Sequence, residues 1–263
     1  MELGLKNKTA LVTGGATGIG EAITLDLAKE GVNVIYSSRK SGSIDKIEKK
    51  LSKFPCNSHP ILGDVNDSDD LNRIVKEAFS VNGTIDILVN NVGHTLGITD
   101  PYCSLDDWHA VMKLNFEVAV EASNLVIPAM KKQDWGRIVH ISAGAGLENS
   151  GPVTYSVSKA ALVAYTRTMG RILATETTNV VMSSVLPGII ITEQGHWAEV
   201  LKTRPEHAEK YINERSPLGR FGEIHEISPM VTLLCSELAS FCQGAIVPVD
   251  AGQGKHYMSF NYL

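Results

Sequence analysis

The first thirty residues constrain the fold of this chain more than any other stretch. A short apolar run at residues 9–13 ends at Gly14 and Gly15, and apolar residues then recur at helical spacing over residues 19–28. In the turn between them, Gly14, Gly18 and Gly20 would let the backbone bend sharply and approach a pyrophosphate, which the N–H groups of a helix N-terminus attract. A glycine-rich turn that binds no phosphate is the alternative interpretation.

The same alternation of strand and helix continues along the chain. Strand-like apolar runs lie at 32–38, 59–65, 85–89, 137–141, 180–186 and 245–250, and helical patterns lie at 43–53, 68–80, 105–130, 154–174 and 223–239. A strand that is apolar almost throughout, such as 85–89, is typical of a parallel sheet covered by helices on both faces. We therefore predict an α/β fold of the Rossmann type, with a doubly wound, parallel, seven-stranded sheet. Pro248 predicts that the last strand lies at an edge or has a covered end.

Length and composition limit the class of protein. The chain has 263 residues, and we expect residues 1–263 to form one domain with small mobile helices over about 189–215 as a cap on the substrate side. The net charge of -5, with scattered Lys and Arg, predicts neither a nucleic acid nor an anionic membrane as partner. No membrane span, secretion signal or metal-ligand spacing of the four cysteines is visible, so we expect a cytoplasmic protein with reduced thiols and no metal site.

The end of the predicted second strand bears on the choice of dinucleotide. An acidic residue at this position binds the ribose 2′-OH of NAD, whereas an arginine accommodates the 2′-phosphate of NADP. Residues 38–40 are Ser38, Arg39 and Lys40, with no acid among them. The sequence therefore favours NADP(H), while NAD(H) stays an alternative because Arg39 could be a plain surface charge.

Polar residues also follow the next two predicted strands. Asp64 comes at the end of the third strand, and Asn90, Asn91 and Gly93 come at the end of the fourth. The carboxyl ends of parallel strands share one edge of the sheet, where open α/β sheets bind their ligands. Asp64 could equally cap the helix at 68–80, and asparagine pairs also occur as simple turn formers.

The strongest chemical signal is the spacing of Tyr155 and Lys159. Residues four apart on a helix share a face, so both side chains can reach one point in a cleft. A tyrosine has a pKa of about 10, and a nearby lysine charge favours the phenolate and lowers that pKa. Ser142 ends the predicted fifth strand and can fold back beside the phenol. Asn115 interrupts an apolar helix face, as a structural anchor or as part of a water relay.

In this order and spacing, the motifs resemble those of the short-chain dehydrogenase/reductase family over essentially the whole length. They are Thr13-Gly14-x-x-x-Gly18-Ile19-Gly20, Asp64-Val65, Asn90-Asn91-x-Gly93, Asn115, Ser142, Tyr155-x-x-x-Lys159, Pro187-Gly188 with Thr192, and Asp250. The chain looks like the single-domain, 3-oxoacyl-acyl-carrier-protein-reductase-like members. It departs from them in the loop after Gly93, where His94-Thr95-Leu96 replaces their common Ile-Thr-Arg stretch.

The resemblance implies roles for these residues. Tyr155 would be the catalytic acid or base, and Lys159 would lower its pKa and hold the nicotinamide ribose. Ser142 would hydrogen-bond the substrate oxygen, and Asn115 would hold a water that links Lys159 to solvent. The cofactor would be held by Gly14, Thr17, Gly18, Ile19, Ser38, Arg39, Asp64, Val65, Asn91, Val92, Gly93, Tyr155, Lys159, Pro187, Gly188, Ile190 and Thr192.

The function implied by the resemblance is an NADP-dependent oxidoreductase that interconverts a ketone and a secondary alcohol, a 3-oxoacyl thioester being one candidate substrate. An NAD-dependent secondary alcohol or sugar dehydrogenase is the alternative, and a non-catalytic dinucleotide-binding regulator is a remote one. The family also implies a homotetramer, formed through the helices near 105–130 and 154–174 and through the last strand. We further expect the aromatic C-terminal residues 255–263 to pack on a neighbouring subunit.

Overall fold

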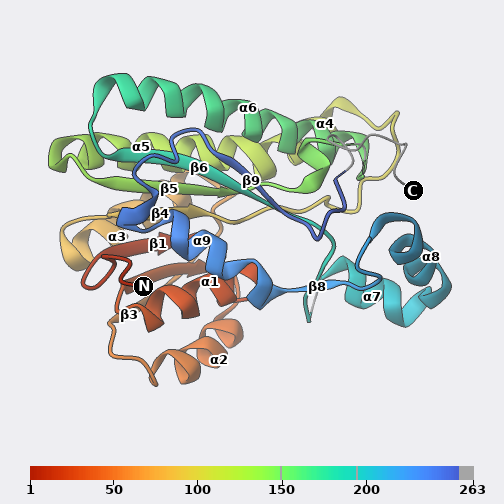
Figure 1. The fold of residues 1–263 in the computed structure, drawn as a ribbon, viewed down its shortest axis with the longest axis horizontal. Coiled ribbons are helices and arrows are strands. Elements are labelled where there is room, and N and C mark those ends of the chain that lie inside the picture. The colour runs from red at the N-terminus through yellow and green to blue at the C-terminus, as the bar shows by residue number, and fades with distance from the viewer. Residues whose placement is uncertain (149, 194, 255–263) are drawn as a thin grey trace.

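Seven parallel strands form the central sheet of the molecule, in the order β3-β2-β1-β4-β5-β6-β9 (Figure 1). The computed structural model describes residues 1–148, 150–193 and 195–254, so the expected contact of residues 255–263 lies outside the described residues. The strands of this sheet are β1 (Thr9–Val12), β2 (Asn33–Ser38), β3 (Ser58–Leu62), β4 (Ile87–Asn90), β5 (Gly136–Ile141), β6 (Val180–Pro187) and β9 (Ile246–Val249). The predicted doubly wound parallel sheet is confirmed.

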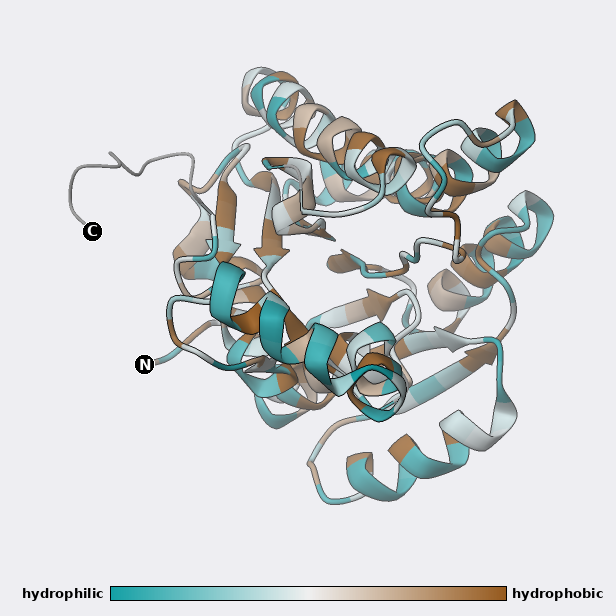
Figure 2. Cartoon of the chain, turned by 90° about the vertical axis from the view of Figure 1, so that its right-hand side faces the viewer, coloured by the Kyte–Doolittle hydropathy of each residue, from teal (hydrophilic) through white to brown (hydrophobic). Residues whose placement is uncertain are grey.

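Helices cover both faces of the sheet. The larger helices are α1 (Gly18–Lys29), α2 (Ser41–Leu51), α3 (Ser68–Asn82), α4 (Leu105–Met112), α5 (Val118–Gln133), α6 (Val153–Glu176), α7 (His196–Thr203), α8 (Pro205–Arg215) and α9 (Ser228–Leu234). One apolar cluster joins the sheet to α1, α2 and α9, and a second joins it to α3, α5 and α6. Brown residues recur in the strands in Figure 2, next to pale and teal ones, and the helices mix teal and brown turns, as expected for helices with one face on the sheet.

Successive residues of the central strands divide between these two clusters. In β1, Ala10 and Val12 belong to the cluster with α1, whereas Leu11 belongs to the cluster with α3. Residues in a strand point alternately to opposite faces, so a strand covered on both sides must be apolar at every position. This requirement explains why β1 and β4 lack the polar alternation of a half-exposed strand.

Both edge strands of the sheet contain a proline. Pro60 lies in β3 opposite Tyr36, and Pro248 lies in β9 opposite Leu186. A proline cannot donate a main-chain hydrogen bond, so it is tolerated where one side of the strand has no neighbouring strand. The edge position expected from Pro248 is confirmed.

Two predicted helices are interrupted in the structure. The helical stretch at 105–130 is broken into α4 and α5 by a π-helical turn at Lys113–Glu117, as one of the two forms expected. The prediction of one helix at 223–239 is wrong: short 3₁₀ turns at Ile224–Glu226 and Glu237–Ala239 flank α9. Pro229 explains the first break, because proline fits the first turn of a helix but cannot continue one.

A two-stranded parallel sheet that the sequence did not indicate joins the two ends of the segment at residues 190–223, which includes most of the cap expected at 189–215. β7 (Ile190–Ile191) pairs with β8 (Gly222–Glu223), and α7 and α8 lie between them in the chain. A further 3₁₀ turn, Gly144–Gly146, follows β5 and packs on α6. None of the helices in the described part of the chain combines the length and apolar character needed to cross a membrane.

Candidate active site

The glycine turn after β1 lies where the strand order of the sheet reverses, between β1 and β4. Gly14 and Gly18 adopt φ values of +63° and +58°, which non-glycine residues rarely adopt. A Cβ on Gly14 would lie 2.9 Å from Val92, and a Cβ on Gly18 would lie 3.5 Å from the methyl group of Thr192. The structure thus brings Val92 and Thr192, from two distant parts of the chain, beside the turn.

The start of α1 is free to receive an anion. Thr17 precedes the helix in an extended conformation, and its hydroxyl makes no capping hydrogen bond to any described residue. The first N–H groups of a helix have no partner within the helix, and they attract phosphate when no side chain caps them. Ile19 follows in the first turn and is partly buried against the core. This donor set suits the pyrophosphate of a dinucleotide.

Asn91 ties the end of β4 to the glycine turn. Its side-chain amide donates to the carbonyl oxygens of Thr13 (3.0 Å) and Gly14 (3.3 Å), and its main-chain N–H donates to the Thr13 hydroxyl. Asn90 contributes differently, because its amide lies against Ser123 and His140 within the buried layer below α5. Only one of the two asparagines therefore shapes the turn.

Arg39 lies at the edge of the sheet beyond β2, with 71% of its side chain exposed. Its guanidinium is 3.7 Å from the carboxylate of Asp64. Arg39 also borders a shallow depression of about 500 Å³, whose lining includes Lys40 and Lys46 as well. The Ser38 hydroxyl donates to the carbonyl of Lys40. Three cations thus gather beside the end of β2.

The alternative role for Asp64, as a helix cap, is wrong. β3 ends at Leu62, and the residue that caps α3 is Asp67, whose carboxylate accepts a hydrogen bond from the N–H of Asp70. Asp64 instead accepts from the N–H of Asn66 and faces Arg39. The next residue, Val65, is buried in the core beneath this segment.

Tyr155 and Lys159 occupy the first two turns of α6. The Lys159 side chain is 2% exposed, and its Nζ donates to the carbonyl of Ile141 at 3.0 Å. The same Nζ lies 5.7 Å from the centre of the Tyr155 ring, so the helical spacing brings the two groups together as expected. The turn at Gly144–Gly146 reinforces this arrangement, because a Cβ on Gly146 would lie 2.9 Å from the Lys159 main chain.

The expected lowering of the tyrosine pKa is not found in the chain alone. Burial raises the pKa of Tyr155 to about 12, and burial lowers the pKa of Lys159 to about 8. Removing a charged group from water disfavours its charged form, so burial acts against both the phenolate and the ammonium. Tyr155 is consequently protonated at neutral pH, which is the form that a proton donor needs.

Ser142 ends β5 beside α6, as predicted. Its side chain is buried, and its hydroxyl donates to the main-chain carbonyl of Lys159 at 3.1 Å. The loop after the strand therefore does return the hydroxyl to the helix that carries Tyr155. The bond to the helix main chain also fixes the orientation of the hydroxyl.

Asn115 lies in the π-helical turn between α4 and α5. Its amide donates to the carbonyls of His94 (2.8 Å) and Val111 (2.9 Å), and its oxygen accepts from the N–H of His94 (3.0 Å). A Cβ on Gly93 would lie 2.7 Å from Lys159 Nζ and 2.8 Å from Asn115 Oδ1, so both side chains converge on this glycine. Of the two roles that the sequence left open, these contacts support the structural anchor, and π-helical turns often occur at functional sites.

The segment after β6 completes the edge of the site. Gly188 donates to the carbonyl of Val249, and a Cβ on it would lie 2.8 Å from the Asp250 main chain. Gln253, which the sequence analysis missed, accepts from the N–H of Ile189 through its side-chain oxygen at 2.9 Å. Pro187 ends β6 and Ile190 begins β7, so the predicted residues flank this contact. Gln253 is 64 residues from Ile189 in the sequence, so only the folded chain, in which the loop after β9 lies beside Ile189, could identify this contact.

The cap contains an aromatic cluster that sequence reasoning also missed. The Trp197 ring lies 4.5 Å from Tyr211, 5.2 Å from Phe221 and 6.4 Å from His207, centre to centre. These residues come from α7, α8 and the segment before β8. Because the four residues belong to different elements, they follow no single helical spacing, and the sequence gives no signal for the cluster.

The residues present fit a nicotinamide dinucleotide. An uncapped helix N-terminus suits a pyrophosphate, the glycines at 14 and 18 leave the turn without side chains, and the three cations beside β2 suit a further phosphate. Among the residues that the structure describes, no three His, Cys, Asp or Glu side chains group as metal ligands. The donor set therefore favours an organic phosphate over a metal ion.

Comparison with known proteins agrees with this site. A family profile described as short chain dehydrogenase matches residues 8–199. A 3-oxoacyl-acyl-carrier-protein reductase of Thermotoga maritima is 33% identical over 94% of this chain and 98% of its own length. A tropinone reductase homologue of Arabidopsis thaliana is 34% identical over 94% of this chain and 92% of its own length.

Solved structures extend the similarity to the whole fold. The L-sorbose reductase of Gluconobacter frateurii, in complex with NADPH and L-sorbose, is 27% identical with a TM-score of 0.89, covering 97% of this chain and 99% of that one. A 7α-hydroxysteroid dehydrogenase in complex with NADH and 7-oxoglycochenodeoxycholic acid is 28% identical with a TM-score of 0.86, covering 95% and 96%. The chain belongs to the short-chain dehydrogenase/reductase family and is an NAD(P)-dependent oxidoreductase that acts on carbonyl and alcohol substrates.

Proposed function

We propose that this enzyme reduces a ketone to a secondary alcohol with NADPH, and that Tyr155 donates the proton. The observation that carries the proposal is the protonated, partly buried phenol of Tyr155 beside the Lys159 ammonium, with the Ser142 hydroxyl anchored on the same helix. A pKa of about 12 keeps the phenol protonated at neutral pH, which favours proton donation to a carbonyl oxygen over proton abstraction from an alcohol.

The bound nicotinamide supplies the hydride that forms the new C–H bond at the carbonyl carbon. The carbonyl oxygen gains electron density in that step and takes the proton from the Tyr155 hydroxyl, which leaves a phenolate. The ammonium of Lys159 stabilises this phenolate. The Ser142 hydroxyl stabilises the developing charge on the substrate oxygen when its proton turns from the Lys159 carbonyl to that oxygen. Asn115 positions the loop at Gly93 and His94, which holds the Lys159 side chain from the other side.

The choice of NADPH depends on Arg39. Arg39, Lys40 and Lys46 place three cations around one depression beside the end of β2, where the 2′-phosphate of NADP would be held. Gly14, Thr17, Gly18 and Ile19 would hold the pyrophosphate. The nearby Asp64 carboxylate offsets part of the Arg39 charge, so use of NADH is the alternative.

The substrate class is supported by two kinds of relative. Similarity to the 3-oxoacyl-acyl-carrier-protein reductases supports a 3-oxoacyl thioester as the substrate of this enzyme, and similarity to the sorbose reductase supports a sugar ketone. Trp197, Tyr211 and Phe221 pack on one another in the cap, and a cap with this aromatic content suits a substrate with apolar carbon surface more than a free sugar. A 3-oxoacyl thioester is therefore the first substrate proposed, and a secondary alcohol or sugar oxidised with NAD is the second.

Calorimetric titration with NADPH and NADH, on the unmodified enzyme and on Arg39→Ala, tests the cofactor. Tighter binding of NADPH, with the preference lost in Arg39→Ala, is expected. Turnover of acetoacetyl-coenzyme A and L-sorbose with each cofactor tests the substrate. Tyr155→Phe should bind NADPH normally and lose about 10²-fold to 10⁴-fold in kcat, the range for a lost acid catalyst. Equal binding of both cofactors, or full turnover in Tyr155→Phe, would refute the proposal.

We also propose a homotetramer. Leu105 at the start of α4 and Val157 and Ile172 on α6 are exposed apolar side chains, with exposed fractions of 73%, 45% and 40%. Contacts between such helices of neighbouring subunits would bury this apolar surface. Light scattering on the eluted peak of a gel-filtration column tests the proposal, and a mass of about 28 kDa, that of a single chain, would contradict it.

A further inference from the structure

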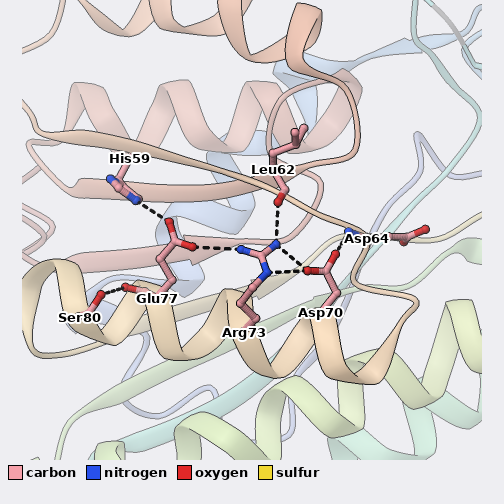
Figure 3. A network of polar contacts seen from close by, with 7 residues as sticks. All are labelled: His59, Leu62, Asp64, Asp70, Arg73, Glu77 and Ser80. Carbon is pink, nitrogen blue, oxygen red and sulfur yellow. Dashed lines mark hydrogen bonds and ion pairs between the residues drawn. The ribbon is translucent and has the colours of Figure 1, made fainter.

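An ion pair on the first turns of α3 holds the segment that follows β3. The Arg73 guanidinium donates twice to Asp70 Oδ1, from Nε at 2.8 Å and from Nη2 at 2.5 Å. Nη2 also donates to the carbonyl of Leu62 at 2.7 Å, and Asp70 Oδ2 accepts from the N–H of Asp64 at 2.6 Å. Figure 3 shows the pair facing the main chain on both sides of residue 63.

The pair leaves no room for a side chain at residue 63. A Cβ on Gly63 would lie 2.7 Å from Arg73 Nη2 and 2.8 Å from Asp70 Oδ2. Charge-assisted hydrogen bonds of this kind are the strong ones in proteins, and the planar guanidinium gives them a fixed direction. Two main-chain groups, the Leu62 carbonyl and the Asp64 N–H, are therefore held in one geometry relative to α3.

The segment held in this way leads to the proposed dinucleotide site. Gly63 donates from its N–H to the carbonyl of Ser38 at 2.9 Å, next to Arg39, and the following residue Asp64 faces the Arg39 guanidinium. β3 is the edge strand of the sheet, separated by β2, β1 and β4 from β5, which carries Ser142 to the catalytic residues. The pair can thus influence cofactor binding without touching the reacting atoms.

We propose that Arg73 is a positioning residue for the dinucleotide: together with Asp70 it holds residues 62–64 ready for the cofactor and so sets the affinity for NADPH and NADH alike. The proposal relies on the proposed function, because it assumes that a dinucleotide binds at this edge. Arg39 selects between the two cofactors through a phosphate that only one of them carries. Arg73 contacts main chain alone at this segment, so its effect has no such selectivity.

Calorimetric titrations of Arg73→Ala with NADPH and with NADH test the inference. Both dissociation constants should rise about fivefold to tenfold, because binding must then order a few residues that the unmodified chain holds in place. The ratio of the two constants and kcat at saturating NADPH should stay unchanged. The dissociation constants of Arg73→Lys should lie between those of the unmodified enzyme and Arg73→Ala, because an ammonium keeps the positive charge but lacks the planar set of donors of a guanidinium.

Glu77→Gln is the matched control. Glu77 contacts Arg73 Nη1 at 3.1 Å and His59 at 3.0 Å but makes no contact with the main chain of residues 62–64 (Figure 3). It belongs to the same ion network, so this variant should bind both cofactors as the unmodified enzyme does. If Arg73→Ala does not fold, as thermal unfolding would reveal, the comparison of Arg73→Lys with Glu77→Gln decides the question.

Three results would overturn the inference. Unchanged dissociation constants in Arg73→Ala would show that the segment needs no support. A loss confined to NADPH would show that Arg73 acts on the phosphate. An equal loss in Glu77→Gln would show a general effect of the network. Failure of the unmodified enzyme to bind either dinucleotide would instead refute the proposed function, and the inference with it.

Discussion

The side chains of Ser142 and Lys159 each donate a hydrogen bond to the main chain of the other's segment. The Ser142 hydroxyl donates to the carbonyl of Lys159 at 3.1 Å, and the Lys159 ammonium donates to the carbonyl of Ile141 at 3.0 Å. The end of β5 and the second turn of α6 are thus bonded in both directions. Each residue holds the other in place, so neither can be changed without an effect on both.

Ser142→Ala should therefore reduce both stability and turnover. Loss of the bond to Lys159 should lower the free energy of unfolding by about 1 kcal/mol, the usual net value for a neutral hydrogen bond. Loss of the hydroxyl should lower kcat by about 10²-fold to 10³-fold, the usual effect of removing one donor to a developing oxyanion. Urea unfolding and ketone reduction with NADPH measure the two effects. A variant that loses stability but keeps kcat would restrict Ser142 to a structural role.

Lys159→Met should remove a pH dependence of the stability between about pH 8 and pH 10.5. The pKa of Lys159 falls from an ordinary 10.5 to about 8 in the folded chain, so the unfolded chain binds the extra proton between these values. The unmodified protein should accordingly gain stability relative to the variant as the pH rises from about 8 to about 10.5. The gain should reach about 3 kcal/mol, at 1.36 kcal/mol for each pKa unit.

Urea unfolding of both proteins at a series of pH values measures this difference. The comparison cancels the titration of the other lysines and tyrosines, which both proteins share. A difference that stays constant from pH 7 to pH 10.5 would show that the ammonium of Lys159 is not destabilised by burial.

Gly93→Ala should impair catalysis more than folding. The new methyl group would meet Lys159 Nζ and Asn115 Oδ1 at less than 3 Å, so the lysine must leave its bond to Ile141. We expect a loss of at least about tenfold in kcat, since a small displacement of a catalytic group has large effects. Initial rates under saturating NADPH measure it.

Gly83→Ala is the control for that experiment. Gly83 ends α3 at φ +74°, far from the catalytic residues in the fold, and a Cβ there would meet no atom within 4 Å. The strained backbone should cost about 1 kcal/mol of stability and leave kcat unchanged. If the two variants lose activity in proportion to stability, Gly93 has no specific role.

His140→Asn should make the protein less sensitive to acid. His140 is fully buried, and burial, assisted by the charge of Lys159, lowers its pKa to about 3. As the pH falls, the unfolded chain binds this proton at about pH 6.5, whereas the folded chain binds it only near pH 3. The free energy of unfolding should therefore fall by about 1.4 kcal/mol for each pH unit below about 6.5. His225→Asn, at an exposed position, is the matched control.

Unfolding free energies measured between pH 7 and pH 4.5 compare these variants. The His140→Asn curve should be flatter than that of the unmodified protein, and the control should follow the unmodified protein. Parallel curves for all three proteins would exclude His140 as a source of acid sensitivity.

Much of the fold and of the site could be predicted because the signals are local. The glycine turn follows β1 directly, Tyr155 and Lys159 lie four residues apart on one helix, and strands such as β1 and β4 are mostly apolar. The interruption of the predicted helix at 223–239 and the pairing of β7 with β8 escaped prediction. The pairing of β7 with β8 depends on contacts between segments distant in the chain, whose short local patterns are ambiguous. The interruption at Pro229 has a local cause, but the helical pattern on both sides of it obscured the break.

Hydrophobic periodicity was sufficient to predict the order of the elements and the parallel sheet, because it acts over one or two helical turns, and the motifs implied the type of reaction through the family resemblance. The direction of the Tyr155 pKa shift could be found only from the folded chain, because it depends on how much water the surrounding residues exclude. The tertiary structure likewise decided that Gln253 meets Ile189 and that Arg73 holds residues 62–64. Such contacts arise from packing between distant segments, and residue spacing does not encode them.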